Sequence, residues 1–152
     1  MSWTVLQPNI FMEVWIGMLV GMPLQQGRPV TLSGRGDHRH AMISMADVAA
    51  FAVASVTHPA ARNTTLVLGG PHAHTWTDVV RLAELVLGRA VELRYAPPGE
   101  ELPGLPRIAS QLAAQFETYE TVIDTSEASA TFGVPLTSVE EFLRRMLHAV
   151  EA

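Results

Sequence analysis

The stretch WTVLQPNIFM, residues 3–12, decides the fold. Residues 3–6 combine apolar and β-branched side chains, a pattern typical of a buried strand. Gln7-Pro8-Asn9 breaks that run, and residues 11–22 then follow an apolar helical pattern. We predict that this helix ends at Gly21-Met22-Pro23, because proline cannot continue the helical hydrogen bonding. A strand that passes directly into a helix is the building unit of α/β folds.

The same alternation continues along the chain. Further strands are expected at 29–32, 64–68 and 91–95, and helices at 45–57, 75–88, 105–117, 126–132 and from 139 to about Val150. Strands that alternate with helices of this length indicate an α/β fold with a largely parallel sheet. The Pro-rich connection after Pro97 and the helical last third suggest a small helical cap on the substrate side of that sheet. At 152 residues we expect a single domain, 1–152.

Polar residues mark three of the predicted helix starts. In each case a Ser or Thr precedes an acidic residue by three positions, the spacing of a capping box. The pairs are Ser44 with Asp47, Thr75 with Asp78, and Ser138 with Glu141.

The composition excludes several functional classes. The net charge is −5 and no basic run exceeds two residues, so we expect no nucleic-acid partner. The absence of cysteine rules out disulfides and thiolate chemistry, and fits a reducing, cytoplasmic setting. The apolar stretch 10–22 contains Glu13 and is too short to span a bilayer, so no membrane insertion is expected. Apolar residues make up 48% and charged residues 16%, which suggests apolar surface covered by a subunit, a missing domain or a ligand.

A set of motifs then resembles one protein family. Residues 3–12 are similar to the W-T-x-L-R-P-x-x-F-M segment of NmrA-like proteins, which are atypical short-chain dehydrogenases/reductases. Ile43 to Ala49 resembles the family's D-V-A helix start, and Thr65 to Pro71 its strand and Gly-Pro loop. Thr75 to Asp78 with Leu87-Gly88-Arg89, and 124–141, resemble its two closing helical motifs. The resemblance implies a Rossmann-like NAD(P)-binding fold, but it covers only the C-terminal half of the family pattern.

The departures from the family concern the cofactor site. No glycines here have the G-x-x-G-x-x-G spacing on a strand-to-helix turn that cradles the pyrophosphate. The Tyr-x-x-x-Lys motif is absent, the chain has no lysine, and Gln7 stands where the family has Arg. We therefore expect a missing N-terminal half, from a longer gene product or a second polypeptide. The expected cofactor is NAD or NADP, but we do not expect the chain by itself to bind it competently.

The resemblance implies site residues at the opening stretch. Gln7, Pro8 and Asn9 would lie beside the nicotinamide, at the carboxyl end of a parallel strand where α/β proteins bind ligands. The alternative is a strand terminator followed by Asn9 as helix N-cap. Phe11, Met12 and Trp15, the next part of the helix, would face a small-molecule substrate. For these three residues ordinary core packing is the alternative.

Histidine suggests two further readings. His40 is a candidate hydrogen-bond donor in the substrate cleft. The pairs His38-x-His40 and His72-x-His74 raise the question of a metal, but no third ligand has recognisable spacing, so we predict none. No catalytic residue can be identified.

Three functions stay open. The first is the substrate-side part of an NAD(P)-dependent oxidoreductase. The second is a non-catalytic, dinucleotide-sensing regulator. The third is a stand-alone half-fold that dimerises to cover its sheet edge.

Overall fold

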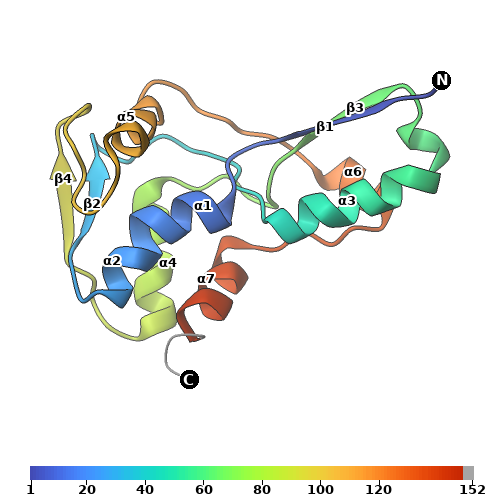
Figure 1. Ribbon diagram of the computed structural model, residues 1–152. Coiled ribbons are helices and arrows are strands. Elements are labelled where there is room, and N and C mark those ends of the chain that lie inside the picture. The colour runs from blue at the N-terminus through green and yellow to red at the C-terminus, as the bar shows by residue number, and fades with distance from the viewer. Residues whose placement is uncertain (149–152) are drawn as a thin grey trace.

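The computed structural model describes residues 1–148, and Val150 of the last predicted helix lies outside this range. The chain alternates between strands and helices, as the sequence predicts (Figure 1). The strands are β1 (Thr4–Pro8), β2 (Val30–Ser33), β3 (Thr64–Leu68) and β4 (Leu93–Ala96). The α-helices are α1 (Met12–Ile16), α2 (Met22–Gln25), α3 (Met45–Thr57), α4 (Trp76–Leu87), α5 (Arg107–Gln115), α6 (Ser126–Phe132) and α7 (Val139–His148). A π-helical segment (Gly17–Gly21) joins α1 to α2, and a 3₁₀ turn (Pro59–Ala61) follows α3.

The strands form two parallel pairs. β1 pairs with β3, with Thr4 opposite Thr64 and Pro8 opposite Leu68. β2 pairs with β4, with Val30 opposite Leu93. Figure 1 shows the pairs at opposite ends of the molecule, with α1, α2 and α4 between them. The predicted α/β class with parallel strands is confirmed.

Two clusters of buried side chains hold these elements together. The larger one joins the α1–α2 segment to β2, α4 and α7, and includes the fully buried Met12 and Ile16. The smaller one lies between α3, β3 and α6 and contains Phe51 and Leu68, which have no exposed surface. Burial of large apolar side chains of this kind is the main favourable contribution to folding.

The predicted end of the first helix is wrong. The backbone continues through Gly21 and Pro23 to Gln25, with Pro23 in the first turn of α2. A proline ring normally clashes with the carbonyl four residues earlier. Here the preceding turn is π-helical, and the wider turn changes the hydrogen-bonding partners at the point where proline has no N–H to donate.

The first strand covers Thr4–Pro8 instead of the predicted 3–6, because Gln7 and Pro8 remain paired with Val67 and Leu68 of β3. The predicted bounds 45–57, 64–68 and 126–132 are confirmed. β4 begins at Leu93 instead of 91, because the Val91 N–H donates to Glu84 Oε1 at 2.9 Å and so leaves the strand ladder. α5 begins only after Pro106.

Two of the three predicted capping boxes form completely. Thr75 with Asp78 and Ser138 with Glu141 exchange both hydrogen bonds. The third forms by half: Ser44 Oγ accepts from the Asp47 N–H at 3.1 Å, but the Asp47 carboxylate does not bond back to Ser44. It accepts instead from the N–H and hydroxyl of Thr137, at 2.7 and 2.8 Å. A tertiary contact has replaced the local one.

Within residues 1–148, none of the helices has the length and apolarity needed to cross a bilayer.

Candidate functional site

A hollow of about 460 Å³ opens at the carboxyl end of β1. β1 and β3 are parallel and end side by side, and the Asn9 N–H extends their ladder by donating to the Leu68 carbonyl at 2.8 Å. One wall of the hollow comes from the β1–α1 connection and the other from α5 and the turn after it. The lining residues are Pro8, Asn9, Ile10, Phe11, Trp15, Leu112, Gln115, Phe116 and Tyr119.

Two of the four lining residues on the α5 side are aromatic: Phe116, which is 5% exposed, and Tyr119, which is 43% exposed. Trp15 and Phe116 meet edge to face, with ring centroids 4.8 Å apart. Phe116 also contacts Trp76 at 5.4 Å, which fixes its ring from behind. Such pairs are favourable beyond the area they bury. Among the described lining residues none is a carboxylate, guanidinium or imidazole, so the hollow suits uncharged, flat chemical groups.

Asn9 acts as a tether at the floor of this site. Its Nδ2 donates to the Ala41 carbonyl at 2.9 Å and to Thr121 Oγ1 at 2.8 Å. The predicted N-cap role of Asn9 is wrong, because the N-cap of α1 is Phe11, which makes no side-chain cap bond. Asn9 instead holds the end of β1 against two segments that are distant in the sequence.

His40 lies behind the aromatic surface and has no exposed area. Its Nδ1 is 3.0 Å from Thr121 Oγ1 and its Nε2 is 3.2 Å from the Phe116 carbonyl. A carbonyl oxygen only accepts, so Nε2 carries the proton and Nδ1 accepts from the Thr121 hydroxyl. Burial lowers the pKa of His40, and the bond to Phe116 opposes this in part. The neutral imidazole therefore connects Thr121 to Phe116.

The structure brings four of the predicted site residues together and separates three. Pro8, Asn9, Phe11 and Trp15 all line the hollow. Met12 and His40 are fully buried and are absent from its lining, and Gln7 is exposed on β1 outside it.

The second wall is missing from the sequence prediction. Leu112, Gln115, Phe116 and Tyr119 have the i, i+3, i+4, i+7 spacing of one helix face, a signal present in the sequence. Periodicity predicts a shared helix face, although α5 ends at Gln115 and Tyr119 lies in the turn beyond it. It does not show that the face lies against the end of β1.

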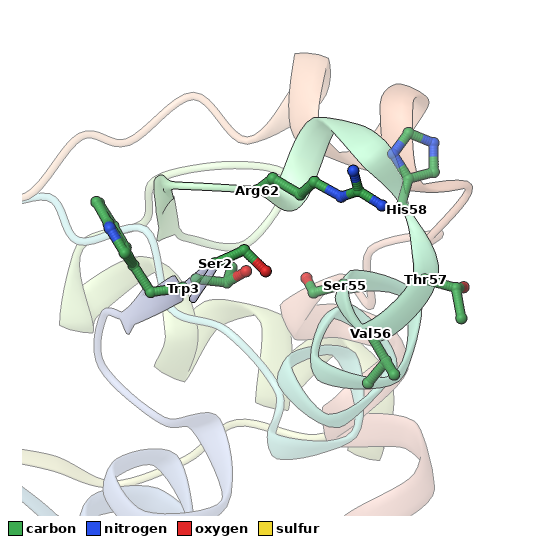
Figure 2. A pocket seen from close by; sticks show the side chains of 8 residues that line it. Ser2, Trp3, Ser55, Val56, Thr57, His58 and Arg62 are labelled. Carbon is green, nitrogen blue, oxygen red and sulfur yellow. The ribbon is translucent and has the colours of Figure 1, made fainter.

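A larger hollow of about 580 Å³ lies at the opposite, amino end of β1, between β1 and the end of α3. Figure 2 shows the Arg62 side chain reaching across it, with Ser2 and Ser55 below. Volume does not make it the better candidate, because open parallel sheets bind ligands at the carboxyl ends of their strands.

One group of described residues has metal-like proximity. The ligand atoms of Asp37, His38 and Glu117 lie within 4.8 Å of one another. Glu117 already accepts from the N–H groups of Arg35 and Gly36, at 2.7 and 2.9 Å. Asp37 pairs with the Arg35 side chain at 2.8 Å. Both carboxylates therefore already bind groups of the 35–36 loop and hold it in place. The rings of the other predicted pair, His72 and His74, are 6.3 Å apart.

Comparison with known proteins identifies the fold. No family model matches the chain. The uncharacterized oxidoreductase YesF of Bacillus subtilis (strain 168) is 33% identical over 92 residues, which are 60% of this chain and 32% of that protein. The chain therefore spans about a third of the length of this curated relative.

Solved structures match almost the whole chain. An NADPH-dependent quinone oxidoreductase from Escherichia coli superimposes with a TM-score of 0.77 at 20% identity, over 97% of this chain and 56% of that one. The same enzyme has been solved with NADPH. A UDP-glucose 4-epimerase from Thermotoga maritima, solved with UDP-glucose, gives 0.73 at 18% identity, over 99% and 46%. The chain thus has the Rossmann-like α/β fold of the quinone oxidoreductase and the epimerase.

Proposed function

We propose that this chain is the substrate-side, C-terminal part of an NAD(P)-dependent oxidoreductase of the NmrA-like, atypical short-chain dehydrogenase/reductase type. One observation carries the proposal: the hollow at the carboxyl end of β1 is lined by Pro8, Asn9, Phe11 and Trp15, which the family resemblance implies as site residues. The sequence similarity to an oxidoreductase and the structural similarity to an NADPH-dependent quinone oxidoreductase support the same assignment.

The described residues fit one part of the cofactor. A nicotinamide ring is flat and carries a neutral amide, which suits the uncharged surface beside Pro8 and Asn9. Among residues 1–148 no loop matches the pyrophosphate. Gly69 and Gly70 do follow a strand, but a Cβ at Gly70 would lie 2.0 Å from the Met42 carbonyl oxygen, so these glycines serve close packing. We propose that a separate polypeptide segment supplies the pyrophosphate loop.

The proposed division of labour is simple. When bound, the nicotinamide supplies the hydride. This chain holds the acceptor against the aromatic surface formed by Trp15 and Phe116, and Asn9 keeps the end of β1 in place. The setting we propose is the cytoplasm, with a small-molecule substrate.

A dinucleotide-sensing regulator is the second candidate. The observation that favours it is the lack of an obvious acid or base: His40 has both ring nitrogens bonded within the protein, and Tyr119 contributes the one hydroxyl among the described lining side chains. A regulator needs the pocket without the proton transfer.

Two measurements test the proposal. Titration of the 152-residue chain with NADPH, followed by nicotinamide fluorescence, should show no tight saturable binding. A chimera in which this chain replaces the matching part of the Bacillus subtilis relative should oxidise NADPH with a quinone or enone acceptor. Binding of NADPH by the chimera without turnover of any acceptor would favour the regulator. A well-folded chimera that neither binds nor turns over NADPH would contradict both.

A further inference from the structure

Helix α5 exposes an apolar stripe that leads to the hollow. Ile108 and Leu112 are 64% and 48% exposed, although both are large apolar side chains. They are four residues apart on α5, and Gln115 continues the same face toward the site. The helix ends at Gln115, and Tyr119 lies in the turn that follows it. Leu112, Gln115 and Tyr119 line the hollow itself, so Ile108 extends its wall outward by one helical turn.

Isolated exposed apolar residues are ordinary on protein surfaces and need no explanation. This stripe differs because it is continuous with a concave, uncharged site. One turn of α-helix adds about 5 Å, so the stripe offers a path for a chain of roughly four to six carbons beyond the aromatic surface.

The lack of charged side chains among the described lining residues limits which ligands can bind in the hollow. A nucleoside diphosphate sugar carries anionic phosphates, and desolvating them needs cationic or N–H partners. The described lining residues offer no arginine, lysine or histidine. The site therefore favours a neutral ligand, although one of the structural neighbours is a UDP-sugar epimerase.

We propose that the substrate is an amphiphile: an uncharged flat ring that lies against Trp15 and Phe116, with an apolar tail along Leu112 and Ile108. This inference rests on the proposed function, since it takes the hollow to be the substrate side of the cleft. The ring packs against the aromatic side chains, and the tail covers the exposed apolar stripe of α5.

The test measures binding and needs no cofactor. The chain is titrated by isothermal calorimetry with menadione, which is a methyl-naphthoquinone, and with its hexyl homologue. The hexyl compound should bind at least about tenfold more tightly, because each buried methylene is favourable. UDP-glucose should not bind. Ile108→Glu should reduce the hexyl-to-menadione affinity ratio to about twofold, because the carboxylate would sit beside the tail.

Val53→Glu is the matched control. Val53 is 74% exposed on α3, away from the hollow, and this variant should keep the wild-type ratio. Equal affinity for the two quinones, an unchanged ratio in Ile108→Glu, or binding of UDP-glucose would overturn the inference. These outcomes are independent of the proposed hydride transfer, which is read from NADPH oxidation by the chimera. A chimera that turns over quinones equally well whatever the length of their tails would support the proposed function. It would contradict the inference that the substrate is an amphiphile.

Discussion

At the scale of single residues, the Asp47 carboxylate shows how a local signal can serve a distant contact. Asp47 is 6% exposed and accepts two hydrogen bonds from Thr137, which is 8% exposed. This pair ties the start of α3 to the segment before α7. Removal of one partner leaves the other buried and unsatisfied, which costs more than the net value of an average hydrogen bond.

Asp47→Ala should therefore lower the free energy of unfolding by about 2–4 kcal/mol. Urea denaturation at neutral pH measures the change. Asp37→Ala is the control, because Asp37 pairs with Arg35 at the surface, and exposed ion pairs contribute about 0–1 kcal/mol. Equal effects of the two variants would show that the Thr137 contact is not formed.

The stability of the fold should decrease in acid because of His40 and His74. Burial lowers the pKa of both imidazoles below the ordinary value of 6.5. The unfolded chain then takes up protons first as the pH falls, so stability is complete above about pH 6.5 and decreases below it. Urea midpoints between about pH 7.5 and 5.5 should fall accordingly. His40→Gln should flatten this dependence, and an unchanged slope in that variant would refute the role of His40.

The sequence predicts the β1–α1 part of the site and misses the rest for a physical reason. Pro8, Asn9, Phe11 and Trp15 are neighbours in the chain, so one strand-to-helix connection brings them together. The bond from Asn9 to Thr121 joins residues 112 positions apart. Such a contact is set by the packing of the whole fold and leaves no pattern in a single sequence.

At the scale of secondary-structure elements, local chemistry predicts where elements begin and end better than how they pair. The caps at Thr75 and Ser138 are encoded within four residues, and both form. The pairing of β1 with β3, and of β2 with β4, links strands more than 50 residues apart. The alternation of strands and helices therefore predicts that the strands are parallel, but it does not predict which strands pair with each other. The wrong helix end predicted at Pro23 also results from backbone geometry that the pattern does not show. A π-helical turn in the preceding segment lets the helix continue through the proline.

Two glycines provide a matched test of element packing. Gly70 follows β3, and a Cβ there would lie 2.0 Å from the Met42 carbonyl oxygen. Gly17 has helical backbone angles, and nothing lies within 4 Å of a Cβ built on it. Gly70→Ala should cost about 3 kcal/mol or more, because backbone must move. Gly17→Ala should stabilise by about 0.5–1 kcal/mol, through helix propensity. Thermal unfolding of both variants distinguishes them, and similar shifts would contradict the close approach at Gly70.

At the scale of the whole molecule, the β1–β3 sheet has one covered face and one bare face. Leu6, Leu66 and Leu68 pack toward α3 and α6. The alternate residues point away from that cluster, and among them Val5 and Val67 are 42% and 49% exposed. Trp3, just before β1, is 51% exposed. An apolar sheet face with open strand edges favours association with another chain.

We therefore expect the 152-residue chain to associate with itself through this face when no other polypeptide covers it. Sedimentation velocity at increasing micromolar concentrations should show a rising mean mass. Val67→Lys places a charge at the centre of the bare face and should weaken the association by about tenfold or more, since a buried unpaired charge is costly. Val53→Lys, on the exposed side of α3, should leave it unchanged. A wild-type chain that remains a clean monomer throughout this range would contradict self-association, and equal effects of the two lysine variants would place it on another surface.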